Sequence, residues 1–412
     1  KIVDIEDIRK KREKKEIGIP IENINKKELK RRGHEIGDIL GCDEKGEEIC
    51  VRKGKGNLYV DGDMEKEQLF DFMRSQIYQN IQRGDSMVIV DLGSRIYKRE
   101  LWIYLTIHGY RVDSYNMDCM TESDCFNCLD GLGAENEEQI VMIANDIIDD
   151  QKYKFMTYPV ETACKALLSA VLLASLTEME ESDRNMLEIA TIFRLGVSGT
   201  MLDKILHVMF EELDETSSAK QLFAMYSEAE EGIRMEAIQK IGNALAVYEK
   251  RANGSLCDNF RTNRYDMEMP VKEKSVLFIE SGQLPEDKVL FSVFMERLYD
   301  SMLKKAEERQ QDVTVMLLDY PYYGGLCGLE KYMEEGPEKG ICTTLYEDDR
   351  KLDGSGYAPH LVELYSLCDI SVCIKDTEIP LCEIEKCENP VTGECSKRKD
   401  GLCYYPATRN QC

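Results

Sequence analysis

The stretch Gly56–Arg95 has the order strand, turn, helix, strand. Asn57–Asp61 is a short apolar run closed by Gly62, and Ser86–Asp91 is an almost uninterrupted apolar run, as in a buried strand. Between them, Glu65–Gln82 carries apolar residues at helical spacing: Leu69, Phe72, Met73, Ile77 and Ile81. The stretch therefore predicts a βαβ unit with a right-handed crossover, as in an α/β domain.

The turn after the first strand stands where a nucleotide phosphate binds in such units. A phosphate loop reads G-x-x-x-x-G-K-[ST], in which backbone N–H groups and the lysine contact phosphates and the hydroxyl holds magnesium. Here one glycine (Gly62) and one lysine (Lys66) remain, and Glu67 replaces the hydroxyl. Asp63 and Glu65 add two more carboxylates. Like charges in one loop disfavour a polyphosphate unless a metal offsets them.

The charge balance narrows the classes of partner. Lys+Arg 53 against Asp+Glu 78 gives a net charge of −25, which disfavours a broad electrostatic contact with nucleic acid or an anionic membrane. No apolar run predicts a membrane span, so we expect a soluble chain. The basic clusters Arg9–Lys15 and Lys26–Arg32 favour a solvated lead-in arm, with juxtamembrane contact as the alternative. Because the chain begins at Lys1, we also expect that an upstream segment has been removed.

The pattern of the chain predicts five regions. Residues 1–56 form a charged arm with short strands, and 57–150 form the first part of the α/β domain. Residues 151–270 carry only helical patterns, including the very apolar Pro159–Glu178, and predict an all-α inserted domain. Residues 271–378 return to strands and complete the α/β domain, and 379–412 form a Cys-rich tail.

Val313–Asp319 is a second buried strand that ends in an acid. In a working motor ATPase the equivalent strand ends Asp-Glu, where the Asp orients water on magnesium and the Glu polarises the attacking water. Here Tyr320 follows Asp319. A tyrosine has a pKa near 10 and does not act as a carboxylate base at neutral pH.

These segments in this order resemble the TraG-like coupling proteins of conjugation and type IV secretion, which are RecA-like motor ATPases. Three family motifs have counterparts here: D-P-K-G-E in Asp91–Arg95, G-Y-x-V in Gly109–Val112, and S-x-x-x-N-P-L-D in Ser123–Asp130. The family sequence L-L-D-E-F is matched by Leu317-Leu318-Asp319. The resemblance covers Asn57–Lys375 and implies a RecA-like, P-loop-type α/β sheet flanked by helices and interrupted by an all-α inserted domain.

The departures from the family fall on the nucleotide path. The vestigial nucleotide-binding residues are Gly62, Lys66, Glu67, Asp91, Asp319 and Tyr320. Cys128 replaces the proline of the third motif, and Thr343 and Thr344 stand where the family carries a Gln-rich sensor strand. We therefore expect a pseudo-ATPase without catalytic residues, with no required cofactor and with ATP and magnesium disfavoured. The alternative is a residual ATPase that uses Lys66 and Asp319 with a base from elsewhere.

The cysteines divide into two groups. Eleven lie between Cys42 and Cys373, often in apolar runs, and predict reduced buried thiols; Cys125-x-x-Cys128 alone is weak evidence for a metal. The tail holds five, with the spacing C-x4-C-x7-C-x7-C-x8-C. Cys382, Cys387, Cys395 and Cys403 are candidate zinc ligands; disulfides and disordered thiols are the alternatives.

The expected partners are proteins of a secretion or conjugation apparatus, with a homo-oligomer or a hetero-oligomer with an active paralogue as the assembly. Direct nucleic-acid binding is disfavoured by the net acidity. The expected location is the cytoplasm, at the inner face of the bacterial membrane if an N-terminal anchor was removed.

Overall fold

The computed structural model describes most of the central part of the chain and short pieces of both ends. The described residues are 19–20, 39–42, 48–50, 56–62, 73, 76–81, 83–92, 96–117, 119–148, 156–194, 198–251, 260–281, 287–318, 326, 328–348, 364, 366–373, 398–399 and 402–403.

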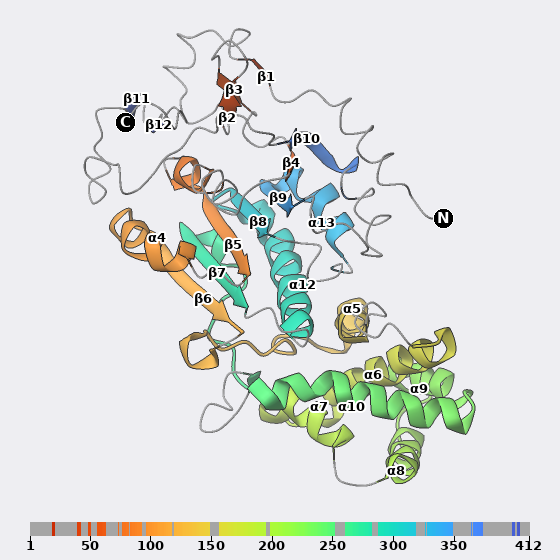
Figure 1. The fold of residues 1–412 in the computed structure, drawn as a ribbon. Coiled ribbons are helices and arrows are strands. Elements are labelled where there is room, and N and C mark those ends of the chain that lie inside the picture. Colours follow the sequence, from red (N-terminus) through yellow and green to blue (C-terminus); the bar gives the residue numbers. More distant parts are fainter. Residues whose placement is uncertain are drawn as a thin grey trace.

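A parallel sheet of seven strands forms the centre of the molecule (Figure 1). Its order is β10-β4-β9-β8-β5-β7-β6, and every neighbouring pair is parallel. The strands are β4 (Asn57–Gly62), β5 (Ser86–Leu92), β6 (Arg111–Asn116), β7 (Ser275–Ser281), β8 (Val313–Leu318), β9 (Ile341–Asp348) and β10 (Cys368–Cys373). The predicted α/β class is confirmed.

The strand order separates the two predicted strands of the βαβ unit. β4 and β5 are parallel members of one sheet, but β9 and β8 lie between them. The end of β4 and the end of β8 therefore lie on either side of β9, at the same edge of the sheet. This is the edge at which ligands bind in open parallel sheets.

The helices follow one another in chain order around this sheet. They are α4 (Ile96–Ile107), α5 (Glu137–Ile148), α6 (Tyr158–Glu178), α7 (Met186–Phe193), α8 (Gly199–Glu211), α9 (Ser218–Ser227), α10 (Glu231–Arg251), α11 (Met269–Lys272), α12 (Asp287–Lys305) and α13 (Leu329–Glu335). The 3-10 turns are η2 (Met120–Glu122), η3 (Ala134–Asn136), η5 (Glu181–Asp183), η7 (Ala306–Glu308) and η9 (Pro337–Lys339).

The two faces of the sheet have separate cores because strand side chains alternate between them. Met87 and Ile89 of β5 join a cluster with Leu101 and Leu105 of α4 and with Ile77, which is in helical conformation. The other face carries Val88 and Val90 and packs with α5, α12, α13 and the helical block. Both faces of the sheet are covered, which explains why its strands read as apolar runs.

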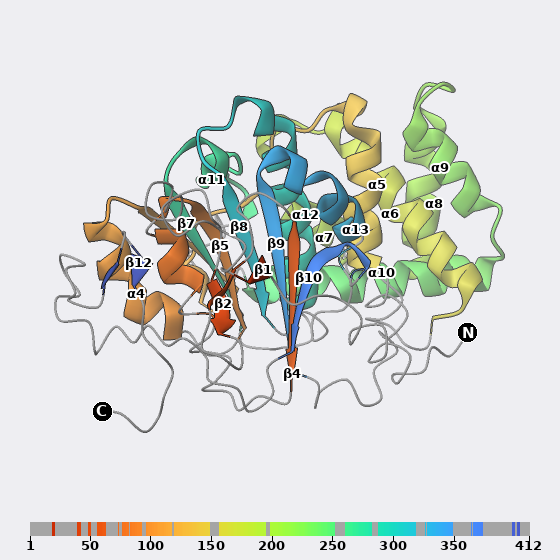
Figure 2. The ribbon, with the colours of Figure 1, turned by 90° about the horizontal axis from the view of Figure 1, so that it is seen from above.

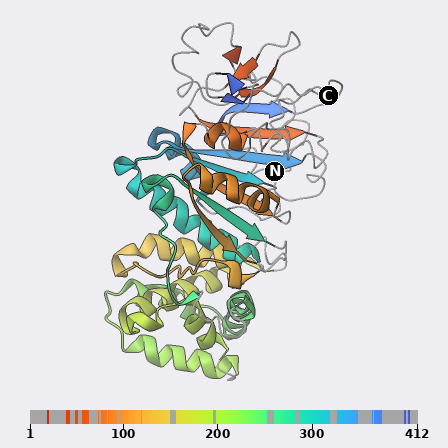
Figure 3. The same ribbon diagram turned by 90° about the vertical axis from the view of Figure 1, so that its left-hand side faces the viewer.

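The helices α6–α10 form an all-α block beside the sheet (Figures 1, 2 and 3). The predicted apolar helix is α6, and it packs against α5, α9 and α10. Among the described residues it alone is long and apolar enough to cross a membrane, and 72% of its most apolar window is buried inside the protein. That burial is what a core helix shows.

Several elements differ from the sequence expectations. The helix α9 was not predicted; it follows the charged joint Glu211–Ser218 that the sequence placed after α8, and its N-cap is Ser217. β10 is a further strand that the pattern did not indicate. The expected strands near the N-terminus are β2 (Ile39–Cys42) and β3 (Glu48–Cys50). β3 pairs with β2 on one side and with β1 (Ile19–Pro20) on the other. A two-stranded hairpin, β11 (Arg398–Lys399) with β12 (Leu402–Cys403), lies in the tail.

Candidate nucleotide-binding edge of the sheet

The carboxyl ends of the seven strands meet at one edge and are rich in acidic residues. β4 ends Asp61-Gly62, β9 ends Glu347-Asp348, β5 ends Asp91-Leu92 and β7 ends Glu280-Ser281. The register places Gly62 beside Asp348 and Asp91 beside Glu280. None of the last two residues of any strand in this sheet is a lysine or an arginine.

One lysine reaches the edge from a helix. Nζ of Lys98, in the first turn of α4, lies 2.8 Å from Oε2 of Glu280 and 2.9 Å from Oγ of Ser114. The Ser114 hydroxyl donates to the same Glu280 oxygen at 2.9 Å. Glu280 is 2% exposed. The positive charge of Lys98 is therefore neutralised by a buried carboxylate.

The Lys98 side chain lies under the ring of Trp102. The two groups are 5.9 Å apart, from Nζ to the ring centroid, and Trp102 lies one helical turn further along α4. The lysine is thus held by contacts from α4, β6 and β7. This arrangement supports the packing of α4 on the sheet and leaves the lysine engaged with protein groups.

The loop after β6 folds back and forms hydrogen bonds with the end of that strand. The backbone N–H of Asp124 donates to the Ser114 carbonyl at 2.8 Å, and the Ser114 N–H donates to the Asp124 carboxylate at 3.1 Å. Oγ of Ser123 accepts from the Asn116 N–H at 3.0 Å. Ser123, the first residue of the family-like loop motif, therefore satisfies the backbone at the end of the strand.

Asn127 ties this loop to the all-α block. Its Nδ2 donates to the carbonyl of Arg184 at 2.8 Å, and its Oδ1 accepts from the N–H of Leu129 at 3.1 Å. Cys128 is buried beside it, and burial raises the pKa of its thiol to about 12. The thiol is therefore neutral. Cys125, Cys128, Cys164 and Cys368 are buried thiols, as the sequence predicted, whereas Cys119 and Cys342 are partly exposed.

The structure describes only part of the predicted nucleotide path. Gly62 and Asp91 lie at strand ends on the expected edge, while Lys66, Glu67, Asp319 and Tyr320 lie outside the described residues. Cys403 is in β12, and Cys382, Cys387 and Cys395 lie outside the described residues. Within the described part of the chain, no group of three or more His, Cys, Asp or Glu residues is arranged to hold a metal.

The predicted sensor positions lie away from the edge. Thr343 and Thr344 are buried in the middle of β9, in register with Val315 and Met316 of β8. The Thr343 hydroxyl is 2.8 Å from the hydroxyl of Tyr299 on α12, and its N–H donates to Asn57. The strand predicted for this stretch is β9, and whether these two threonines stand at the family's sensor position stays a prediction.

The described strand ends supply few of the groups that a magnesium nucleotide needs. A polyphosphate needs N–H or cationic donors, and neither a lysine nor an arginine is among the last two residues of these seven strands. Lys98, the lysine that the described part of the chain brings to this edge, is paired with Glu280. Carboxylates attract a divalent cation, yet they repel the phosphates that such an ion accompanies.

No protein-family model and no curated protein matches the sequence. Solved structures do match its fold. The unbound bacterial conjugative coupling protein TrwB, lacking its N-terminal segment, is 17% identical with a TM-score of 0.57, over 84% of this chain and 74% of that one. TrwB in complex with ADP and Mg2+ is 14% identical with a TM-score of 0.54, over 84% and 76% of the two chains. This chain has the TrwB fold.

The TrwB fold agrees with the order of motifs from β4 to β10 that the sequence indicated. At 14–17% identity the likeness shows the architecture, and the chemistry has to be argued from this chain's own residues.

The ion pair between Lys98 and Glu280 was not predicted from the sequence. A signal existed for the acid, because Glu280 ends an apolar strand run as Asp91 and Asp319 do. No signal joined it to Lys98, which is far away along the chain.

Proposed function

We propose that this chain is a catalytically degenerate relative of the conjugative coupling ATPases, which keeps their fold and acts as a protein-binding or scaffold component of a DNA-transfer or secretion apparatus. The observation that carries the proposal is the acidic edge of the sheet. Asp61, Asp91, Glu347 and Asp348 end the strands there, and the lysine that approaches is engaged by Glu280.

The loss of the phosphate-binding residues points the same way. The turn after β4 has Glu67 in place of the magnesium-binding hydroxyl, and Tyr320 stands in place of the catalytic glutamate. Each change removes a different part of the nucleotide chemistry. Their combination with the acidic edge favours a protein that neither binds nor hydrolyses ATP.

The partners follow from the fold and the charge. TrwB, whose fold this chain shares, is a bacterial conjugative coupling protein, so we infer an apparatus of that kind here, with an active paralogue or further copies of this chain as assembly partners. We place the protein in the cytoplasm or at the inner face of the membrane. A net charge of −25 favours protein contacts over DNA.

The test is calorimetric titration of Mg-ATP into the purified protein and into a Lys66→Ala variant. We expect no heat of binding up to roughly millimolar nucleotide, which corresponds to less than about 4 kcal/mol of binding free energy. Binding in the micromolar range that Lys66→Ala abolishes would overturn the proposal and establish the alternative, a residual ATPase. The proposed binding to proteins of a secretion apparatus is tested by pull-down from the protein's own cell. The absence of secretion components from the pull-down would refute that part of the proposal.

Zinc in the tail remains a separate proposal. Cys382, Cys387, Cys395 and Cys403 would supply four thiolates to a segment poor in apolar residues. Metal analysis of protein purified under reducing conditions tests it. A zinc content of about one per chain supports the site, and a content near zero that persists after zinc addition and desalting refutes it.

A further inference from the structure

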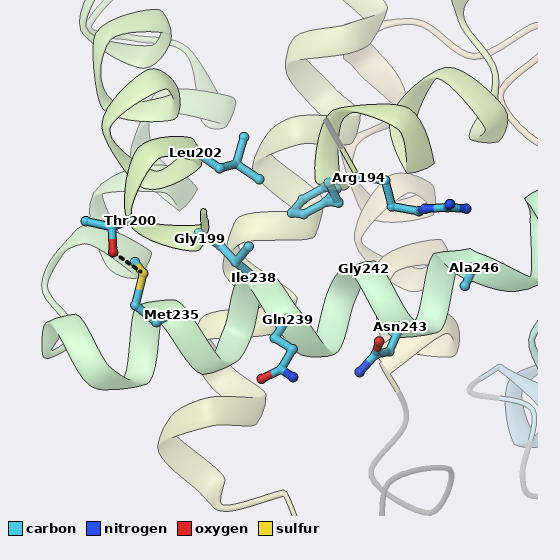
Figure 4. A pocket seen from close by; sticks show the side chains of 11 residues that line it. Arg194, Gly199, Thr200, Leu202, Met235, Ile238, Gln239, Gly242, Asn243 and Ala246 are labelled. Atoms are coloured by element: carbon cyan, nitrogen blue, oxygen red, sulfur yellow. Dashed lines mark hydrogen bonds between the residues drawn. The ribbon is translucent and has the colours of Figure 1, made fainter. Parts of the chain in front are cut away.

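A cleft of about 550 Å³ lies within the all-α block (Figure 4). Its walls are the end of α7, with Phe193 and Arg194, and the start of α8, with Gly199, Thr200 and Leu202. Its floor is one side of α10, formed by Met235, Ile238, Gln239, Gly242, Asn243 and Ala246. These positions recur at intervals of three and four, so they share one face of the helix.

The shape of the floor suits a helix. From Met235 to Ala246 the floor extends about 16 Å, or three helical turns. Gly242 has no side chain, and a Cβ there would lie 3.6 Å from the carbonyl of Phe193, so the end of α7 approaches α10 closely at the middle of the floor. Gln239 and Asn243 are the exposed side chains of the floor, and the partly exposed Met235 and Ala246 lie beside them, so a helix laid along it meets apolar and polar groups together.

The surface of α8 and α9 adds exposed apolar side chains. Met201, Val208 and Met209 of α8 and Met225 of α9 are each more than half exposed. Met201 adjoins the cleft residues Thr200 and Leu202 in the chain. Exposed methionines are typical of surfaces that adapt to apolar partner helices.

The charge of this part of the block defines the partner. Between Gly199 and Glu236 eight acidic residues are exposed, against one exposed lysine, Lys204: they are Glu211, Glu212, Asp214, Glu215, Glu228, Glu230, Glu231 and Glu236. Glu231 lies one turn before Met235 and so continues the floor of the cleft at one end. At the other end Arg194 pairs with Glu249. The exposed Glu230 and Glu231 at the start of α10 favour a partner with basic residues at that end of the cleft.

We propose that this cleft binds an amphipathic helix of a protein partner, with its apolar face along α10 and its basic residues over Glu230 and Glu231. The inference rests on the proposed protein-binding role and names the chemistry of the segment that this role captures. It does not depend on whether the sheet binds nucleotide.

The experiment measures binding of a fluorescein-labelled synthetic helix to the full purified chain by anisotropy, at roughly 150 mM salt. The probe is a peptide of about 18 residues, or five turns, with leucine and alanine on one face and lysines at one end. A matched peptide carries glutamates in place of the lysines. We expect the lysine peptide to bind and the glutamate peptide to bind about tenfold more weakly or not at all.

Two variants test the place of binding. Gln239→Trp fills the cleft from an exposed position, and Glu231→Lys reverses the charge at its end; each should weaken the lysine peptide about tenfold or more. Their controls are Gln221→Trp, an exposed position on α9 outside the cleft, and Glu178→Lys, which changes the net charge equally. Circular dichroism and thermal melting establish whether each variant is folded. If Gln239→Trp does not fold, the binding measured for Glu231→Lys decides the test.

Equal binding by wild type and both variants, or by both peptides, would overturn the inference. The proposed function fails separately. If wild type and Gln239→Trp capture secretion partners from the cell alike, the partners do not bind in the cleft, but the proposed protein-binding function stands. If the purified chain binds the lysine peptide in the cleft and no secretion partner is found, the proposed function is refuted and the inference about the cleft is supported.

Discussion

Nη2 of Arg251 lies 2.5 Å from Oδ1 of Asp287, and Nε of the same arginine lies 3.1 Å from that oxygen. Asp287 is fully buried, and the Arg251 side chain is 16% exposed. Arg251 is the last residue of α10 and Asp287 is the first residue of α12. The ion pair therefore links α10 of the all-α block to α12, which covers one face of the sheet.

Replacing Asp287 with alanine should destabilise the protein by about 3 kcal/mol, because Arg251 is left without its buried carboxylate and α12 loses the acid of its first turn. Urea denaturation followed by circular dichroism measures the loss. The control is Glu335→Ala, which removes a partly exposed pair with Lys339 and should cost less than about 1 kcal/mol. Equal costs for the two variants would contradict this account.

Lys98 and Glu280 should behave as a coupled pair. Lys98→Met leaves the buried Glu280 carboxylate hydrogen-bonded to Ser114 but without its cation, and should cost about 3 kcal/mol, whereas the neutral double variant Lys98→Met with Glu280→Gln should recover part of that loss. A double-mutant cycle of urea unfolding measures the coupling. Additive effects would show that the two side chains do not interact.

Glu296 of α12 is a buried acid that favours its neutral form. It is 2% exposed, and its Oε1 accepts from the hydroxyl of Tyr332. Burial raises the pKa of Glu296 to about 8, and the charge of Asp146 on α5 adds to the rise, while the Tyr332 hydroxyl and the Gly328 N–H oppose it. Asp300, on the same helix, adds a smaller rise.

The pKa of Glu296 is higher in the folded chain than its ordinary value of 4.5, so folding takes up a proton. The stability from this group is present in full below pH 4.5 and is lost as the pH rises through about 8. Glu296→Gln should flatten this part of the pH dependence, measured as urea midpoints at roughly pH 6 and pH 8.5. Glu335→Gln, at a partly exposed position, should leave the slope as in wild type. An unchanged slope in Glu296→Gln would count against the raised pKa.

Asn127 should contribute to the attachment of the all-α block. Asn127→Ala removes the donor to the Arg184 carbonyl and the acceptor for the Leu129 N–H, both in a site where Asn127 is 5% exposed. An unpaired buried polar group costs about 1–3 kcal/mol, and we expect a loss of that size in urea unfolding. Thr177→Ala, at an exposed position of α6, is the control. A loss no larger than the control's would refute the role.

The sequence predicted the strands that are apolar throughout and the helices with clear periodicity. β5, β7 and β8 lie where the apolar runs placed them, since a strand covered on both faces leaves a continuous signal. α9 was missed because its segment, Ser218–Ser227, is short and begins among polar residues. Local pattern also does not determine which strands are neighbours, so the insertion of β9 and β8 between β4 and β5 was not foreseen.

The sequence predicted where the candidate nucleotide-binding edge of the sheet lies, but not which residues of the other strands join it. Asp91 and Gly62 end strands as expected, since any parallel sheet brings its carboxyl ends together. The acidic partners came from β7 and β9, whose positions depend on the order of the sheet. The depth of Thr343 and Thr344 within β9 could not be predicted either, because it follows from the register of the strands, which a single sequence does not show.

The position of the all-α block has a consequence for the order in which the chain folds. β6 and β7 are neighbours in the sheet, yet the whole block lies between Asn116 and Ser275 in the chain. Closing a long loop costs little extra free energy, because the entropy grows only with the logarithm of its length, but contacts between distant residues form slowly. A block that folds first, from contacts local to itself, brings its two ends to fixed positions and shortens the search. The edge strand β6 would then be the last to acquire its partner, and until that moment the sheet would remain open on that side.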